Sequence, residues 1–161
     1  MKAFFDTNIL VYSMDRGEPR KRDLAQAVMH RHMADGSFVV STQVMLEFFN
    51  VMTRKHKAPP QKMLSALEVL ARNQVVSTGG DFALRAARLC TAEQATTFDA
   101  AILQAALDSG CEVLYSEDFQ AGRRYGMLEV VNPFLSAAHE PMPPNTRQSA
   151  RRPVAPRSQR L

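Results

Sequence analysis

The sequence lacks the features of a secreted, membrane-spanning or zinc-binding protein. Its two cysteines, Cys90 and Cys111, have no metal-ligand spacing, so they indicate neither a zinc site nor a disulfide framework. Asp6 stands where a signal peptide would need a continuing apolar run, and no apolar run approaches the length that spans a membrane. We expect a soluble, cytoplasmic protein whose thiols are reduced and lie in the core.

The main part of the chain also lacks an excess of charge. Residues 1–135 carry 15 basic and 15 acidic side chains, so the net charge of +4 arises from five arginines against Glu140 in residues 136–161. This final segment is rich in Pro, Arg, Ser and Ala, and we expect it to be disordered. Two interpretations stay open: a solvated extension, or an arm that binds phosphate backbones or an acidic partner.

What is present suits one compact domain over residues 1–135. The chain has 161 residues, of which 45% are hydrophobic. Short apolar runs predict strands near residues 2–5, 38–40, 75–76, 112–115 and 127–131. Helical spacing predicts helices near residues 9–12, 21–34, 42–53, 60–72, 81–93 and 97–109. Because strands alternate with helices, we expect an α/β sandwich around a mostly parallel sheet.

Two aspartates come soon after predicted strands. Asp6 follows the first strand, and Asp118 follows the strand that ends at Tyr115. Both therefore emerge at the C-terminal strand edge, where ligand sites gather in open parallel sheets. Each also has an ordinary structural explanation, because Asp6 can cap the next helix and Asp118 lies in a turn beside Ser116 and Glu117.

Glu47 lies on a predicted helix that has almost no other polar residues. We expect its carboxylate to be at least partly buried and to need a partner, because burying an unpaired charge costs several kcal/mol. The structural alternative is a salt bridge with Arg54 or Lys55, although both lie far along the helix from Glu47.

Asp99 lies in the first turn of another apolar helix. Thr96 or Thr97 can cap this helix, and the helix dipole favours an acid in its first turn, so a structural role is sufficient by itself. Four small residues let the helix pack closely on the sheet and bring Asp99 near the strand ends: Ala100, Ala101, Ala105 and Ala106.

Together these four carboxylates predict a site for a divalent cation. Ligation by oxygen alone favours Mg²⁺ or Mn²⁺. Such an ion can activate a water molecule and stabilise charge on a leaving oxygen, so hydrolysis of a phosphodiester needs no nucleophilic Ser or Cys. Thr7, Asn8 and Ser116 supply hydroxyl and amide groups that can orient water or carboxylates.

At these positions the sequence resembles PIN-domain nucleases of the VapC toxin type. The matching pieces are Phe5-Asp6-Thr7-Asn8, Glu47 in an apolar helix, the run from Phe98 to Leu103, and the run from Leu114 to Asp118 followed by Gly122. Each short motif is weak alone. Their order and separations agree with the family over about residues 1–135, and the ordered set is specific.

The resemblance implies a three-layer α/β/α sandwich and Mg²⁺-dependent endonucleolytic cleavage of RNA, with Mn²⁺ as a possible substitute. It also implies the toxin role in a toxin–antitoxin pair, frequent homodimers and inhibition by a cognate antitoxin. By this resemblance Asp6 and Asp99 are the principal metal ligands, Asp118 is a further ligand, and Glu47 completes the acidic site. The supporting residues are Thr7, Asn8, Ser116 and Glu117.

Several positions keep two interpretations. Arg123 and Arg124 follow the fourth acid, and they are either phosphate contacts or ordinary solvated loop residues. A hydrophobic groove for an antitoxin is expected between the early helices, with Val28, Phe48 and Met52 as candidates. The tail after about Ser136 departs from compact members of the family.

Two other functions compete with the nuclease. One is a catalytically idle PIN-like module that binds RNA or protein, which the presence of all four acids disfavours. The other is a phosphotransfer or phosphatase domain like the haloacid dehalogenases, with Asp6 as nucleophile. That site would need a second aspartate two positions later, where this sequence has Asn8.

Overall fold

The protein is described here by a computed structural model that covers residues 1–135; the expected tail at 136–161 lies outside the described residues. Six strands form one sheet in the order β3-β2-β1-β4-β6-β5. All neighbouring strands pair in parallel except β5 and β6. The strands are β1 (Ala3–Phe5), β2 (Phe38–Ser41), β3 (Gln74–Val76), β4 (Val113–Tyr115), β5 (Arg124–Tyr125) and β6 (Leu128–Val131).

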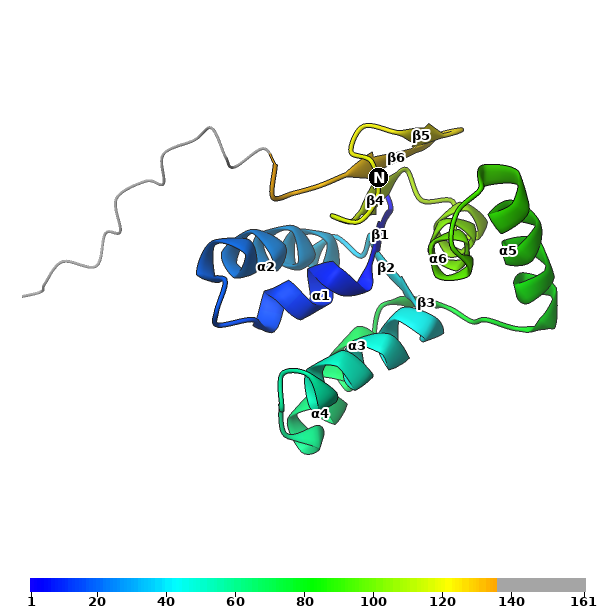
Figure 1. The fold of residues 1–161 in the computed structure, drawn as a ribbon. Coiled ribbons are helices and arrows are strands. Elements are labelled where there is room, and N and C mark those ends of the chain that lie inside the picture. Colours follow the sequence, from blue (N-terminus) through cyan, green and yellow to red (C-terminus); the bar gives the residue numbers. More distant parts are fainter. Residues whose placement is uncertain (136–161) are drawn as a thin grey trace, which may run out of the picture.

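Helices cover both sides of the sheet, which gives the expected three layers (Figure 1). In this view α1 and α2 lie on one side, and α5 and α6 lie on the other. The pair α3 and α4 pack on each other, and α3 also packs on α1. The helices are α1 (Thr7–Met14), α2 (Pro19–Ala34), α3 (Thr42–Arg54), α4 (Pro60–Leu70), α5 (Gly80–Glu93) and α6 (Thr97–Asp108).

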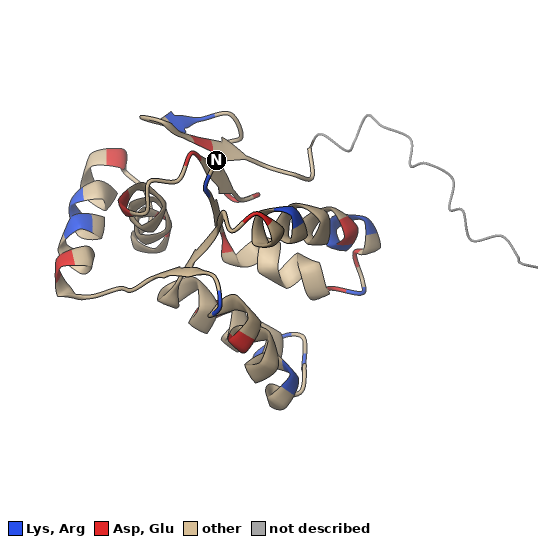
Figure 2. Ribbon diagram, turned by 180° about the vertical axis from the view of Figure 1, so that it is seen from behind, with Lys and Arg blue, Asp and Glu red and all other residues tan. Residues whose placement is uncertain are grey.

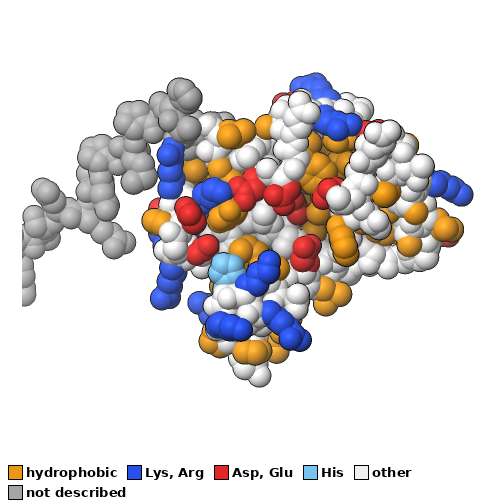
Figure 3. Space-filling model, in the orientation of Figure 1, with side chains coloured by type: hydrophobic (Ala, Val, Ile, Leu, Met, Phe, Trp, Pro, Cys, Tyr) orange, Lys and Arg blue, Asp and Glu red, His pale blue; other side chains and the backbone are white. Residues whose placement is uncertain are grey.

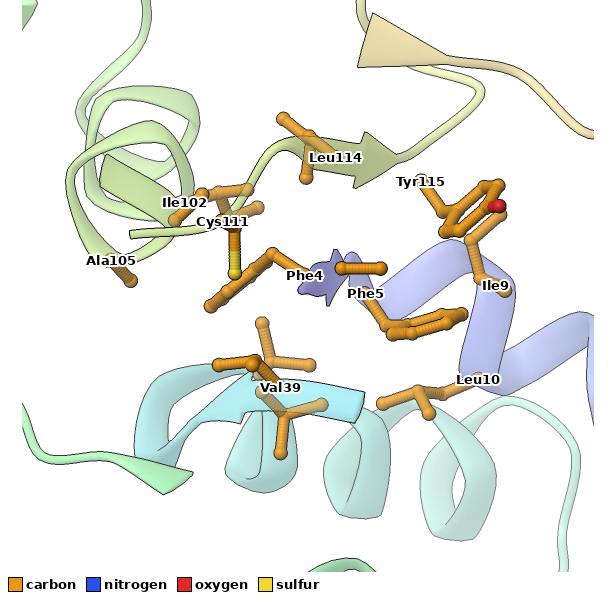
Figure 4. Packing of buried hydrophobic residues seen from close by; sticks show 14 of the residues in the cluster. Phe4, Phe5, Ile9, Leu10, Val39, Ile102, Ala105, Cys111, Leu114 and Tyr115 are labelled. Atoms are coloured by element: carbon orange, nitrogen blue, oxygen red, sulfur yellow. The ribbon is translucent and has the colours of Figure 1, made fainter. Parts of the chain in front are cut away.

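The core is built on β1, whose side chains are buried on both faces of the sheet. Phe5 stacks on Phe38 and on Tyr115, with ring centroids 4.3 Å and 5.1 Å away. On the other face Phe4 lies beside Ile102 of α6 (Figure 4). Each large side chain buried in this way contributes about 1.5–3 kcal/mol. Burial on both faces explains why the central strands read as short continuous apolar runs.

The close packing of α6 is confirmed. Ala100, Ala105 and Ala106 are fully buried, and Ala101 is nearly so. Small side chains allow the helix axis to approach the sheet, so the first turn of α6 is held at a fixed place beside the strands. This turn carries Asp99.

One strand escaped the sequence patterns. β5 has only two residues, and it pairs antiparallel with β6 so that Tyr125 lies opposite Leu128. The tight turn between them begins at Gly126, whose φ of 62° lies in the left-handed region that glycine adopts readily. A strand of two residues, one of them charged and exposed, leaves no alternating pattern to recognise.

Both cysteines are free thiols, as expected. Cys111 is buried, but Cys90 is only half-buried, so the expectation that both lie in the core is wrong for Cys90. Within residues 1–135 no helix is both long and apolar enough to cross a membrane.

Candidate active site

The candidate site begins where β1 and β4 end side by side. Phe5 and Tyr115 are partners in the parallel register, so the next residues, Asp6 and Ser116, leave the sheet together. The Ser116 hydroxyl donates a hydrogen bond of 2.6 Å to Asp6 Oδ2, and the Asp6 N–H donates to the Tyr115 carbonyl. Two residues that are 110 positions apart are thereby joined at the C-terminal strand edge.

Asp6 has a structural role as well as a place in the site. Its Oδ1 accepts the backbone N–H of Thr7 at 2.6 Å and caps α1, which confirms the capping interpretation. Its other oxygen, Oδ2, accepts hydrogen bonds from Ser116 and from Asn8. One carboxylate therefore serves two purposes, and the cap holds it at a fixed orientation.

The electrostatics of Asp6 are unfavourable to its charge. Burial raises the pKa of this carboxyl from 3.8 to about 6; the hydrogen bonds from Ser116 and Thr7 oppose the rise, and the nearby charges of Asp118 and Glu47 add to it. Asp6 is only 3% exposed. A cation held beside it would favour the ionised form.

Asn8 connects the first carboxylate to the fourth. Its Nδ2 lies 2.9 Å from Asp6 Oδ2 and 3.0 Å from Asp118 Oδ2, and it also donates to Ser116 Oγ. The other end of this amide, Oδ1, is buried and has no hydrogen-bond partner among residues 1–135. Buried acceptors are rarely left unpaired, so this oxygen is a natural contact for water or a cation.

Glu47 is exposed, which corrects the expectation of partial burial. The buried positions of α3 recur every four residues, at Val44, Phe48 and Met52, and Glu47 lies off that face. Its apolar sequence neighbours therefore do not surround it in space. Instead of a salt bridge with Arg54 or Lys55, its Oε2 accepts a hydrogen bond of 2.8 Å from the Thr7 hydroxyl.

Asp99 is half-buried in the first turn of α6. Thr96 is the cap, since its hydroxyl oxygen accepts the backbone N–H of Asp99 at 3.2 Å. This hydrogen bond closes the first turn and limits the positions that the Asp99 carboxylate can reach.

All four predicted carboxylates line one cleft of about 360 Å³: Asp6, Glu47, Asp99 and Asp118. Glu117 lines it too, and its carboxylate pairs with Lys21 at 2.6 Å. In Figure 3 acidic side chains gather across the middle of the exposed face, with a histidine and basic side chains beside them. Asp6 and Asp99 therefore meet in one cleft at the C-terminal edge of the sheet, although they come from helices on opposite sides of it, and sharing an ion requires such a meeting.

The donor chemistry of this acidic cleft fits a hard divalent cation, because all the acidic donors are carboxylate oxygens. Within the described part of the chain, however, no three His, Cys, Asp or Glu side chains converge closely enough to hold an ion as they stand. Glu47 is engaged by Thr7, and Asp118 by Asn8. Side-chain rotations within the cleft are needed to bring three carboxylates onto one ion.

The basic residues around the cleft differ from those considered in the sequence. Arg123 pairs with Glu93, Arg124 pairs with Glu129, and neither arginine lines the acidic cleft. Lys55 and His56, at the end of α3, do line it. The sequence signal for Lys55 and His56 is the basic run that follows the helix carrying Glu47. Only the packing of α3 on α1 brings this run beside the acidic residues.

A separate apolar groove of about 350 Å³ lies among α1, α2, α3 and α4. Phe48 lines it as expected, together with Leu10, Met29 and Leu70. The candidates Val28 and Met52 do not line it. Met52 is buried in the core, and Val28 packs against the core.

A short parallel sheet between helical layers, with carboxylates gathered at its C-terminal edge, defines an α/β protein with an acidic strand-end site. The chain belongs to the PIN domain family, whose model matches residues 3–126. No curated protein sequence matches the chain.

The solved structures that share this fold include two toxin–antitoxin complexes and one toxin. A toxin–antitoxin complex from Klebsiella pneumoniae has a TM-score of 0.59 at 21% identity, covering 82% of this chain and 98% of that chain. DNA-bound VapBC from Salmonella typhimurium has a TM-score of 0.58 at 14% identity, covering 81% and 96%. A sarcin-ricin loop cleaving VapC toxin from Mycobacterium tuberculosis has a TM-score of 0.57 at 15% identity, covering 70% and 87%.

Proposed function

We propose that this PIN-domain protein is a metal-dependent endoribonuclease that acts as the toxin of a toxin–antitoxin pair. The observation that carries the proposal is that four carboxylates line one cleft; they come from the N-cap of α1, from α3, from α6 and from the segment after β4. The toxin and toxin–antitoxin neighbours support it by analogy of fold. RNA is the proposed substrate, and a homodimer stays a prediction.

Asp6, Asp99 and Asp118 would hold Mg²⁺, with Mn²⁺ as a substitute, and Glu47 completes the acidic site. When bound, such an ion lowers the pKa of a coordinated water and offsets charge on the phosphate. Asn8 and Ser116 orient Asp6 through their hydrogen bonds, and Thr7 orients Glu47. These contacts hold Asp6 and Glu47 at the cleft, from where side-chain rotations would bring the carboxylates onto one ion.

Lys55 and His56 are the proposed phosphate contacts of the cleft. They lie on its rim and are exposed, so a polyanionic substrate can reach them. Attraction by these groups offsets the repulsion between a phosphate backbone and four carboxylates. Arg123 and Arg124 keep a lesser role as candidates for contacts farther along the RNA, because each is already paired with a glutamate.

An antitoxin is the proposed protein partner, and the apolar groove among α1 to α4 is the place where its apolar side chains would bind. The groove is lined mainly by Leu, Met, Val, Ala and Phe side chains. Exposed apolar grooves of this kind favour an amphipathic segment of a partner.

The proposal is tested by replacing Asp6 or Asp99 with Asn and mapping cleavage of total RNA in Mg²⁺. Each variant removes a charge from the cleft and keeps the side-chain size, so we expect cleavage to fall at least about 100-fold. Asp81→Asn is the matched control. Asp81 lies in the first turn of α5, as Asp99 does in α6, but outside the acidic cleft.

Undiminished cleavage by both variants would refute the assignment of the site. A wild type that binds RNA but cleaves none of it, with Mg²⁺ or Mn²⁺, would support the idle binding module instead. Manganese titration followed by thermal unfolding gives a readout besides activity: the ion should raise Tm of the wild type more than that of Asp6→Asn.

A further inference from the structure

A second cleft adjoins the acidic one and shares a wall with it. Six residues line this side cleft: Gln43, Leu46, Glu47, Asn50, Thr78 and Phe98. Glu47 and Phe98 line both clefts. Whatever occupies the side cleft therefore lies directly beside the reaction site.

Phe98 is the most unusual residue of this wall. It is 70% exposed although it is a large aromatic side chain, and it immediately precedes Asp99 in the first turn of α6. A single exposed apolar residue is ordinary on a protein surface. An exposed aromatic face between the acidic cleft and the side cleft is a suitable surface on which a planar ring can stack.

The rest of the side cleft supplies hydrogen-bonding groups. Gln43 Nε2 is buried and has no hydrogen-bond partner among residues 1–135, so rotation of this amide into the cleft that Gln43 lines would give the unused donor a partner. Asn50 lies two helical turns further along α3 and lines the same cleft. Amide side chains can pair with the edge of a base through a donor and an acceptor at once.

We infer that the side cleft binds an unpaired nucleobase of single-stranded RNA, which stacks on Phe98 while Gln43 and Asn50 contact its edge. The inference rests on the proposed function and adds to it a group that positions the substrate. A base held here places its neighbouring phosphate at the acidic cleft, because the two clefts meet at Glu47 and Phe98. RNA is read mainly through such unpaired bases.

A nucleobase fits the lining better than a second copy of the chain does. The apolar part of the cleft consists of Leu46 and Phe98, and the remaining lining residues are polar or charged. A stable protein interface needs about 800 Å² from each partner, with a mainly apolar centre. A stacked ring needs one aromatic face and a few polar groups, which is what this cleft offers.

The experiment measures binding of a fluorescently labelled 10-nucleotide single-stranded RNA in EDTA, so that cleavage does not interfere. Phe98→Ala should weaken binding by about 5- to 150-fold, the loss expected for one stacked base. Phe98→Tyr should restore it. Leu84→Ala is the matched control, because Leu84 is also an exposed apolar helix residue, at 60%, and lies outside both clefts.

A set of RNAs with one abasic site at successive positions identifies the stacked base. At that position the abasic RNA should bind the wild type and Phe98→Ala equally well, because no ring is left to stack. Gln43→Ala should reduce discrimination among the four bases there. Equal binding of intact RNA by the wild type and Phe98→Ala would overturn the inference.

Light scattering of the wild type and of Phe98→Ala tests whether a second copy of the chain occupies the side cleft instead. A dimeric wild type that becomes monomeric in Phe98→Ala would assign the cleft to an interface between copies and overturn the base site. Failure of the base site can be distinguished from failure of the proposed nuclease function. If RNA binding depends on Phe98 but no RNA is cleaved, only the nuclease proposal is refuted. If cleavage depends on Asp99 but not on Phe98, only the base site is refuted.

Discussion

Asp6 shows how a proposed metal ligand can be costly to the fold. Its carboxylate is buried beside two other acids, so its charge is tolerated only through hydrogen bonds from Thr7, Ser116 and Asn8. Sites of this kind commonly exchange stability for function. The same burial that raises the pKa of Asp6 makes it receptive to a cation.

We therefore predict that Asp6→Asn is more stable than the wild type, by about 1–3 kcal/mol at pH 7.5 in EDTA. The folded pKa of about 6 exceeds the unfolded value of 3.8, so the folded state binds more protons between these values. The penalty of the charged form is complete above pH 6 and disappears below about pH 4. Urea unfolding at several pH values should show that the extra stability of Asp6→Asn over the wild type shrinks as the pH falls from about 6 to about 4.

If the free energy of unfolding falls with urea concentration at the same slope for both proteins, their unfolding exposes similar surface and their stabilities can be compared directly. A variant less stable than the wild type at pH 7.5 would mean that the hydrogen bonds to Asp6 outweigh the burial of its charge.

At the scale of the element, α6 matters because it delivers Asp99 to the cleft. Its alanines set the distance of the helix from the sheet, and its cap sets where the first turn begins. The same logic applies to α3, where Ser41 caps the helix that carries Glu47. Capped helices thus carry Asp99 and Glu47, two of the four carboxylates.

Removing the cap of α6 tests this role. Thr96→Ala deletes the hydroxyl that accepts the Asp99 N–H, and we predict a loss of about 1 kcal/mol in the free energy of unfolding. RNA cleavage should fall as well, because the first turn frays and Asp99 is less well placed. Chemical denaturation and initial cleavage rates measure the two effects.

Thr97→Ala is the control for this prediction. Thr97 is exposed at the next position and is not the cap, so its loss should be nearly neutral. Equal effects of the two substitutions would show that the hydroxyl of Thr96 has no special role.

At the scale of the whole molecule, charge is distributed in a way that does not by itself attract RNA. Figure 2 shows acidic and basic residues together on α2 and on α5. The counts of the two signs are equal over residues 1–135, and the excess of arginine lies in 136–161. Attraction of RNA to the acidic cleft must then come from local groups such as Lys55 and His56. Any attraction over a longer range must come from the arginines of residues 136–161.

We predict that a chain ending at Leu135 keeps the fold, with Tm within about 2 °C of the full chain, because residues 1–135 contain a continuous hydrophobic core of their own. Calorimetry tests the stability. RNA binding at several salt concentrations tests the arm: a shallower dependence of log K on log salt after truncation supports it. An unchanged slope identifies the tail as a solvated extension, and a large fall in Tm would refute the domain boundary.

Much of the fold was accessible from sequence because its signals are local. The apolar runs of β1, β2, β4 and β6 and the helical spacing of α2 to α6 correspond to the elements observed, within a few residues at their ends. A threonine cap, at Thr96 or Thr97, and the small residues of α6 were also predictable from the sequence, and the structure shows that Thr96 is the cap. The order of the four acids along the chain was sufficient to indicate the family.

What depends on packing was not accessible in this way. Glu47 is exposed because α3 buries another face, and Arg123 and Arg124 meet glutamates that lie 30 and 5 residues away in sequence. Phe98 gains its significance only from the side cleft that α3 and α6 form between them. The sequence by itself determined which elements form and which acids are available. Tertiary structure decided which side chains meet, because contacts between distant residues depend on how whole elements pack.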